Sequence, residues 1–596
     1  MTTNKEKKIK ALFIFPPTWS TFSISTGIPQ IMGYLIQNGY EDVEALDLNI
    51  KFHRYYYKKS RLKKLLEDIR KEKNRLFKDI YFDKTGKIET YNVKKSIFYT
   101  YDSYLRKIKD DKILKQAIND FSELIHTKDK SLNTLSKYAN KTMKINDLIC
   151  ISIPNSITFS PNHYITYFNN NFDKPLINYY GKIIEKILKN EYDYIGFSVN
   201  HSAQVNTAFL LSKMLKEKGY NGHISWGGTS INEEINIIKS SRRFFEEIVD
   251  SVMLGAGEVP TKELFEYIKG KRRIEDISNI MYKTEDNIIV QNQIKNQYIT
   301  EFITPSYRGY DIKDYTLPEN VLPIRTSTGC YWGKCTFCDY NVLTKYKSRT
   351  ADDVINEIKT LIKKHKVNNF YFVDAALSPK FLDEFSRKII EQKLEIYYFT
   401  NLRFEAIYTK EFLQRLYDSG LRCAGWGFES ASPRILKLMN KGTNIETTQK
   451  ILIDSHNIGI SNHLYLIIAF PTETQEEFNT TIDFIYKNKE RISSIAEHYF
   501  HLKKNSYIYS NKSEFKLNEN RIKEIEIRKQ GINSFSSIDL GLKIDFEYYD
   551  KQIEILRKEI KENYKYSESS FETLLLASKY MSLKKEKKNF WSKLFK

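Results

Sequence analysis

Short apolar runs alternate with amphipathic stretches through the second half of the chain. The runs with the length of buried strands are Leu322–Thr326, Asn369–Val373, Ile396–Thr400, Cys423–Phe428, Leu464–Phe470 and Ser494–Phe500. Stretches with helical periodicity lie between them, for example Ala351–Lys364 and Lys380–Gln392. This alternation is typical of parallel β/α units. We therefore predict six such units within residues 318–505.

The first part of the chain shows a second series of strands and helices. Strand patterns occur in KALFIFPP, VEALDLN, YDYIGFSV, GHISWGG and VDSVMLGAGE, with amphipathic helices between several of them. Such a series predicts a doubly wound, Rossmann-like α/β domain over residues 1–270, with a ligand crevice at the strand C-termini. The sequence has no GxGxxG fingerprint, which counts against NAD or FAD.

Three further segments complete the predicted organisation. A stretch rich in Lys and Tyr, about residues 52–190, has helical patches and is too long for a loop, so we expect a helical insertion. Residues 271–317 are predicted as a linker. Residues 506–596 are predicted to be mostly helical, in a position to cover the mouth formed by the β/α units.

Composition narrows the class of protein. A chain of 596 residues with 41% hydrophobic residues predicts a globular protein of two to four domains. The longest apolar runs fall short of the roughly 20 residues that a membrane span needs. The N-terminus also lacks a signal-peptide pattern, so we expect a cytoplasmic protein without a membrane span.

The net charge of +20 suggests an anionic partner at first sight. The lysines are scattered over the chain rather than gathered in one stripe. We therefore do not expect a nucleic-acid partner.

Three of the five cysteines, Cys330, Cys335 and Cys338, lie within nine residues in the sequence TSTGCYWGKCTFCDY. Grouped thiolates favour zinc or an iron–sulfur cluster over a disulfide framework. A zinc site or a plant-type ferredoxin cluster needs a fourth ligand, and the next cysteine, Cys423, is remote. A third interpretation is a 4Fe-4S cluster that leaves one iron open to an amine and a carboxylate. The spacing alone leaves these three interpretations.

The segment GCYWGKCTFC resembles the signature loop of the radical S-adenosylmethionine (SAM) superfamily. Its four residues between the first two cysteines are similar to the variant found in the branch with cobalamin-binding domains. The resemblance implies a partial (β/α)6 barrel, with a 4Fe-4S cluster on Cys330, Cys335 and Cys338. It also implies SAM on the open iron and an external electron donor of the flavodoxin or ferredoxin type.

The same resemblance implies SAM contacts at the ends of the predicted strands. Phe337 matches the aromatic residue that packs near the adenine, and Asp374 stands where the family often has a Gly-Gly-Glu turn for the SAM amine. Arg403 is placed like the basic residue that contacts the SAM carboxylate or ribose.

Two later strand ends resemble further family segments. Glu429 and Ser430, in GFES, are similar to the GxES segment that faces SAM. Ala469, in IIAFPTET, stands where the family usually has a glycine in contact with the adenine.

The succession PP, HSAQ, WGG and GAGE in the first domain resembles the cobalamin-binding domain that is fused to radical SAM barrels. The resemblance implies cobalamin contacts from Pro17, Ser202, Gly227, Gly228, Gly255, Gly257 and Glu258. A Rossmann-like scaffold that has lost its cofactor is the alternative. The sequence DSHNIG at 454–459 has a cobalt-ligand spacing, D-x-H-x-x-G, but we interpret it as the end of a helix within the barrel.

The resemblance implies a cobalamin-dependent radical SAM enzyme that methylates an unactivated carbon of a peptide or specialised metabolite. The same architecture could instead catalyse radical cyclisation, rearrangement or epimerisation. A methylthiotransferase is disfavoured because the N-terminal cysteine triad of that subgroup is missing. A non-catalytic metal-binding protein is a third class.

Overall fold

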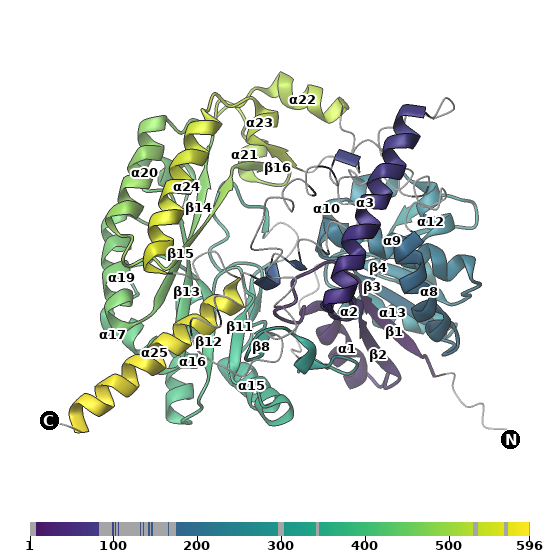
Figure 1. Cartoon of the computed structure of the whole chain (residues 1–596), viewed down its shortest axis with the longest axis horizontal. Coiled ribbons are helices and arrows are strands. Elements are labelled where there is room, and N and C mark those ends of the chain that lie inside the picture. The colour runs from purple at the N-terminus through teal and green to yellow at the C-terminus, as the bar shows by residue number, and fades with distance from the viewer. Residues whose placement is uncertain are drawn as a thin grey trace.

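The structure is a computed structural model of the 596-residue chain. It describes residues 8–82, 174–295, 303–340, 345–528, 534–564 and 570–594, together with some residues between 98 and 165. Two large, mainly parallel sheets lie side by side, one from each half of the chain (Figure 1).

The N-terminal sheet has the order β2-β1-β3-β4-β5-β6-β7. Its parallel strands are β1 (Ala11–Phe15), β2 (Val43–Asp47), β3 (Tyr194–Ser198), β4 (His223–Gly227) and β5 (Ser251–Met253). All five residues of β1 are buried, as expected for a parallel strand covered on both faces. The predicted doubly wound domain is confirmed.

Two antiparallel strands, β6 (Ile280–Lys283) and β7 (Ile289–Gln291), extend this sheet beyond β5. They lie within residues 271–317, which the sequence predicted as a linker. Part of that segment is therefore a hydrogen-bonded edge of the first domain.

Helices cover both faces of the N-terminal sheet. The helices are α1 (Gly27–Gln37) and α13 (Glu258–Ile268) on one face, α2 (Leu48–Tyr56), α8 (Lys174–Leu188) and α9 (Ser202–Glu217) on the other, and the short α10 (Thr229–Glu233), α11 (Ile235–Lys239) and α12 (Arg242–Glu247). The long helix α3 (Lys59–Phe82) agrees with a helical insertion, although most of residues 83–173 lie outside the described part of the chain.

The second sheet is parallel and has the order β8-β11-β12-β13-β14-β15. Its strands are β8 (Val321–Ile324), β11 (Asn369–Phe372), β12 (Tyr397–Arg403), β13 (Leu421–Glu429), β14 (Ser461–Ile468) and β15 (Ser494–Tyr499). The strands follow one another in sequence order, and β8 and β15 form the two edges. The predicted open barrel of six β/α units is confirmed.

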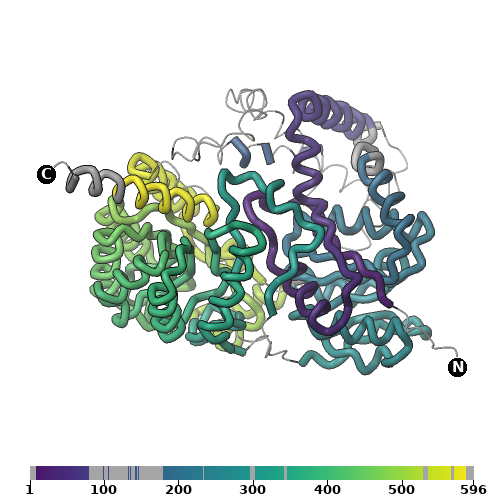
Figure 2. Tube along the Cα trace, turned by 90° about the horizontal axis from the view of Figure 1, so that it is seen from below, coloured from purple at the N-terminus to yellow at the C-terminus, as the bar shows by residue number. Residues whose placement is uncertain are grey.

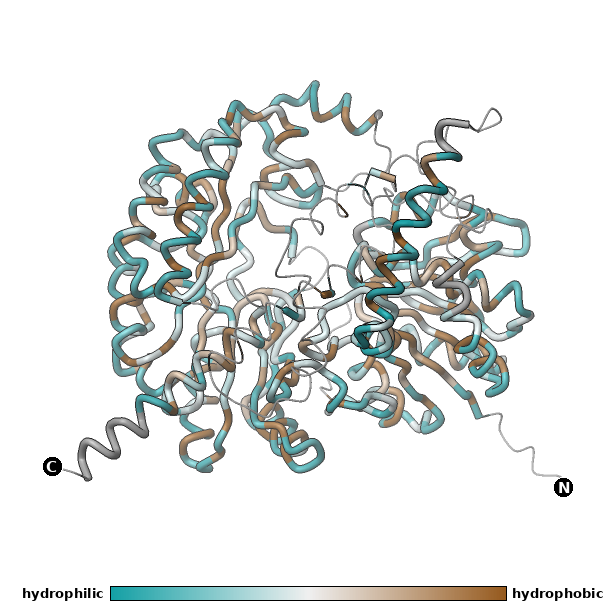
Figure 3. The backbone as a smooth tube through the Cα atoms, viewed as in Figure 1, coloured by the Kyte–Doolittle hydropathy of each residue, from teal (hydrophilic) through white to brown (hydrophobic). Residues whose placement is uncertain are grey.

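Helices with one apolar face follow the barrel strands, and the apolar colour in Figure 3 concentrates on the strands and on these faces. The helices are α15 (Ala351–His365), α16 (Pro379–Glu391), α17 (Lys410–Asp418), α18 (Pro433–Leu438), α19 (Ile445–Ile458) and α20 (Gln475–Lys487). Helix α19 ends at Ile458, with Gly459 in the left-handed region (φ 110°). The sequence DSHNIG is therefore a helix end, as predicted.

The loop after β1 lies along the open edge of the barrel. Ser23 forms a parallel bridge with Val321 of β8, and Thr316 N donates to Thr21 O (3.0 Å). Figure 2 shows this early segment, in purple, beside the teal chain that enters the barrel. The N-terminal domain thus contributes to the wall of the second domain.

The C-terminal region covers two different parts of the barrel. Helix α25 (Phe571–Leu594) lies across the strand N-termini, where Lys579 Nζ donates to Asn369 Oδ1 (2.9 Å) and Ser578 Oγ to Ser461 Oγ (2.7 Å). This is the end opposite to the mouth, so the expectation that the whole region covers the mouth is wrong for α25. Helix α24 (Phe546–Asn563) packs on α20 and β15 instead.

The remaining C-terminal elements lie beside the cysteine loop. They are β16 (His501–Lys503), β17 (Ser534–Ser536), α21 (Tyr507–Ser510), α22 (Glu519–Arg528) and α23 (Ser537–Leu540). Their apolar side chains share a cluster with Phe337, Met439 and Phe470.

Candidate functional site

The cysteine loop follows β8 and the short strand β9 (Ser327–Thr328), which pairs with β10 (Lys347–Ser348). The pKa of the Cys338 thiol is raised to about 11, mainly by burial and to a smaller extent by Cys335 and Cys330, while the hydrogen bond from Tyr340 N lowers it. The three thiols belong to one loop of nine residues. Within the described ranges, no three His, Cys, Asp or Glu side chains converge as the ligands of a single metal ion would.

Hydrogen bonds from the end of α18 and the segment after it hold this loop. The contacts are Thr336 N to Met439 O (3.1 Å), Thr336 Oγ1 to Leu438 O (2.8 Å), Asn440 Nδ2 to Lys334 O (3.0 Å) and Trp332 Nε1 to Asn440 O (3.1 Å). The positions of the cysteines thus depend on a segment about a hundred residues further along the chain.

A substitution at Gly442 tests the contact between Trp332 and the segment after α18. Gly442 has φ 68°, and an added Cβ would lie 2.4 Å from Trp332 Cζ2. We expect Gly442→Ala to lower the iron bound after anaerobic reconstitution by about 3- to 10-fold, measured by iron and sulfide assay. Gly39→Ala is the control, because Gly39 has φ 83° and open space around it. Equal iron in both variants would contradict the role of the contact.

Two buried cations stand beside the loop. The Arg403 guanidinium lies over the Trp332 ring (3.8 Å to its centroid) and Nη2 donates to Lys441 O (2.5 Å). Lys441 Nζ forms a buried ion pair with Glu429 Oε1 (2.7 Å). Burial raises the pKa of Cys335, whereas Lys441 and Arg403 lower it. These cations favour the thiolate form that a cluster requires.

Arg403 also keeps one hydrogen-bond donor unused. Its Nε donates to Glu405 Oε1 (2.9 Å), but the buried Nη1 has no hydrogen-bond partner among the described residues. A buried guanidinium nitrogen without an acceptor is costly, and a carboxylate is its natural partner. The site therefore fits a ligand that has a carboxylate near the cysteine loop, as SAM has.

The residues predicted to contact SAM fall into two groups. Phe337, Arg403 and Glu429 gather around Lys441, whose Nζ lies 6.0 Å from the centre of the Phe337 ring. Glu429 adopts a left-handed backbone (φ 65°) at a register shift between β13 and β14. These three side chains remain our proposed SAM contacts at the open iron.

The polar atoms of the other predicted residues are engaged within the protein. The Asp374 carboxylate accepts from Ser327 N (2.6 Å), Ser327 Oγ (2.7 Å) and Thr326 N (3.0 Å), so it fixes the start of the cysteine loop. Ser430 Oγ lies 3.2 Å from Thr481 Oγ1. Ala469 N donates to Glu473 Oε2 (2.7 Å). SAM contact by these three residues stays a prediction.

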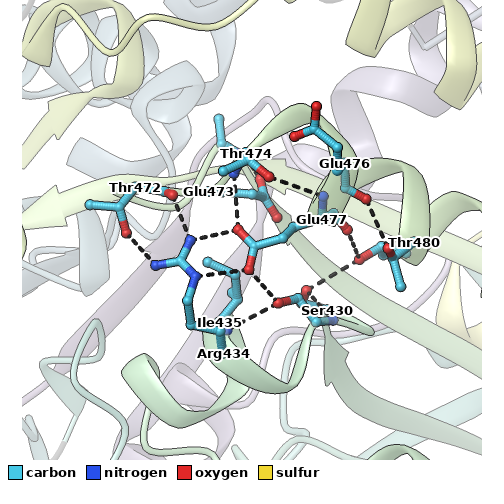
Figure 4. Close-up of polar contacts among 12 residues, drawn as sticks. Ser430, Arg434, Ile435, Thr472, Glu473, Thr474, Glu476, Glu477 and Thr480 are labelled. Carbon is cyan, nitrogen blue, oxygen red and sulfur yellow. Dashed lines mark hydrogen bonds and ion pairs between the residues drawn. The ribbon is translucent and has the colours of Figure 1, made fainter.

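A polar network joins the turns after β13 and β14, both of which hold predicted SAM residues (Figure 4). Arg434 donates from Nε to Glu477 Oε1 (2.9 Å) and from Nη2 to Glu477 Oε2 (2.5 Å), while its Nη1 donates to Thr472 Oγ1 (3.0 Å). Ser432 Oγ also donates to Glu477 Oε1 (2.7 Å). This bidentate pairing fixes the two turns relative to each other.

Glu473 in this network gives a pH-dependent prediction. Burial raises its pKa from 4.5 to about 8, against the hydrogen bonds from Ala469 and Phe470 that lower it. Between pH 4.5 and about 8, the folded state therefore holds a proton that the unfolded state has released. The contribution of Glu473 to the free energy of unfolding is full below pH 4.5 and is lost as pH rises through about 8.

We expect the free energy of unfolding of the wild type to fall, relative to Glu473→Gln, by about 2 kcal/mol between pH 6 and pH 9. Urea unfolding at the two pH values measures the difference. Glu476→Gln is the control, because Glu476 is fully exposed in the same turn and its pKa is lowered instead. A Glu473→Gln profile parallel to that of the wild type would refute this role.

The residues predicted to contact cobalamin lie at the C-terminal edge of the first sheet. Gly227 ends β4, Gly228 follows it, and Gly255, Gly257 and Glu258 follow β5, while Pro17 follows β1 and Ser202 begins α9 after β3. The strand order reverses between β1 and β3, and ligands of doubly wound sheets bind at such a point. Cobalamin contact by these residues remains a proposal.

Local packing gives two of these glycines another role. Gly228 has φ 118°, and an added Cβ would lie 2.4 Å from Val199 O, while a Cβ on Gly257 would lie 2.7 Å from Ile31 Cδ1. Close packing against other parts of the chain therefore also explains why glycine stands at these two positions. Gln204, which was not among the predicted site residues, bridges the β1 and β3 ends through Pro16 O (2.7 Å) and Asn200 N (2.8 Å).

A cavity of about 740 Å³ lies between the two domains. Its wall combines residues 19–26 of the loop after β1, the inner faces of β8, β11, β14 and β15, helix α24, and residues 570–572. Trp19, in this wall, also contacts the His201 ring beside β3 (6.0 Å between centroids). The cavity therefore adjoins the ligand edge of the first sheet and the inside of the barrel.

Residues 324–485 match the family model of the radical SAM superfamily. The solved radical SAM methyltransferase TsrM from Kitasatospora setae, with cobalamin and a 4Fe-4S cluster bound, has a similar fold (TM-score 0.52, 13% identity, 84% of this chain and 77% of that one). The fold is thus shared over both domains.

Two curated relatives match at similar identity. An uncharacterised methyltransferase of Pyrococcus horikoshii is 26% identical over 51% of this chain and 66% of its own length. A putative methylthiotransferase of Methanocaldococcus jannaschii is 26% identical over 48% of this chain and 73% of its own length.

No described helix is long and apolar enough to cross a membrane.

Proposed function

We propose that this chain is a cobalamin-dependent radical SAM enzyme that methylates an unactivated carbon of a peptide or specialised metabolite. The main support for this proposal is the cavity between the barrel and the carboxyl edge of the Rossmann-like sheet. When bound, the 4Fe-4S cluster supplies the electron that cleaves SAM to methionine and a 5′-deoxyadenosyl radical, and cobalamin supplies the methyl group.

The chain's own residues would position these groups. Cys330, Cys335 and Cys338 would hold the cluster, and Arg403 Nη1 would donate to the SAM carboxylate. The carboxyl edge at β1 and β3 would hold cobalamin, with the loop at residues 19–26 between it and the cavity. A flavodoxin- or ferredoxin-type donor would supply the electron.

The names of two further relatives support methyl transfer and, as an alternative, cyclisation. A bacteriochlorophyllide d C-12(1)-methyltransferase of Chlorobaculum tepidum is 29% identical over 28% of this chain. An anaerobic magnesium-protoporphyrin IX monomethyl ester cyclase of Rubrivivax gelatinosus is 26% identical over 39% of it. Radical cyclisation is therefore the second candidate function.

Corrinoid retention tests the cobalamin part of the proposal. After anaerobic reconstitution with iron, sulfide and hydroxocobalamin, followed by gel filtration, we expect about one corrinoid per chain by visible absorbance. A protein that retains its iron but no corrinoid would exclude both candidate functions.

A further inference from the structure

The interdomain cavity has mainly apolar and aromatic walls. Trp19, Tyr371 and Phe571 contribute rings, and the Tyr371 and Phe571 rings stack with centroids 5.6 Å apart at 25°. Apolar side chains of β8, β15 and α24 add to this lining, beside several polar groups. Walls of this kind accept a ligand with an apolar or aromatic body.

The charges in the cavity wall do not balance. Glu497 and Arg557 form an ion pair, so they neutralise each other. Glu572 is 8% exposed, and its Oε1 accepts from Ser23 Oγ. In the described part of the chain, no Lys, Arg or His forms an ion pair with Glu572.

The other polar groups in the wall include two histidines, His463 and the exposed His498. Burial lowers the pKa of His463 to about 3, so its ring is neutral at pH 7. Glu497 Oε2 is buried and has no hydrogen-bond partner among the described residues. The wall thus has one carboxylate without a counter-ion, which would repel an anionic ligand and attract a cationic one.

We propose that this cavity takes a substrate with an amino group on an apolar or aromatic body, and that the Glu572 carboxylate binds the ammonium. This inference depends on the proposed function only because it calls the bound ligand a substrate. Ser23 orients the carboxylate from the first domain, so the binding group is assembled from both domains.

Two small probes test this proposal on the full-length chain. 2-Phenylethylamine and 3-phenylpropionate share a phenyl ring and differ in the sign of their charge. By isothermal titration at pH 7, we expect the amine to bind at least about 10-fold more tightly than the carboxylate. In Glu572→Gln this preference is expected to fall to about 2-fold or less.

Glu562→Gln is the matched control, because Glu562 is an exposed residue of α24 outside the cavity wall. It is expected to keep the full preference. Ala496→Trp, which fills the cavity from β15 and leaves Glu572 unchanged, is expected to abolish binding of both probes. This variant tests the site even if Glu572→Gln does not fold.

Equal binding of the two probes by the wild type, or a preference retained in Glu572→Gln or in Ala496→Trp, would overturn the proposal. These binding measurements need no turnover. SAM cleavage without an amine preference would therefore refute this inference alone, whereas an amine preference without SAM cleavage would refute the proposed function alone.

Discussion

Serine in place of Cys330, Cys335 or Cys338 is expected to reduce the formation of 5′-deoxyadenosine from SAM by at least about 1,000-fold, because iron–sulfur clusters select soft thiolate ligands. The three thiols share one loop of nine residues. Loss of one ligand should also lower the bound iron. Iron and sulfide assays, with product analysis under dithionite, measure both effects.

Cys423→Ser is the control for this series. Cys423 is buried in β13, and burial raises the pKa of its thiol. We expect this variant to keep its iron and its 5′-deoxyadenosine formation. Loss of the cluster in Cys423→Ser would instead indicate a fourth, remote ligand, as in a ferredoxin or a structural zinc site.

Arg403→Gln is expected to weaken SAM binding by about 100-fold, because it removes a buried charge with an unused donor. Equilibrium binding of SAM to the reconstituted protein measures the change. Iron content must be measured in parallel, since Arg403 also stacks on Trp332 of the cysteine loop.

Arg387→Gln gives the matched control. Arg387 is exposed on α16 and pairs with Asp383 one helical turn away. Its removal should leave SAM affinity unchanged. An Arg403→Gln protein with full iron and an affinity within about threefold of the wild type would exclude the proposed contact.

The barrel strands could be predicted from the sequence because their apolar runs are short, buried and separated by amphipathic helices. Asn369–Val373 and Ser494–Phe500, for example, differ from β11 and β15 by one residue at the end. Phe337, Arg403 and Glu429 could also be placed near the cysteine loop, because each stands at a fixed offset from a strand or a cysteine, and their contact with SAM stays a prediction.

The contacts between distant segments could not be predicted in this way. Asn440 and Trp332 meet at the cysteine loop because the segment after α18 returns to it, and Lys441 was not among the predicted site residues. Ser23 and Glu572 come together only when both domains fold. Local periodicity contains no information on such pairs.

The products of SAM test the central claim most directly. The protein reconstituted with iron, sulfide and hydroxocobalamin is incubated anaerobically with SAM, a reductant and a substrate selected by its binding to the cavity. We expect both 5′-deoxyadenosine and S-adenosylhomocysteine, the first from radical formation and the second from methyl transfer. 5′-Deoxyadenosine alone would favour the cyclisation alternative, and the absence of both products from a protein with full iron and corrinoid would contradict the account.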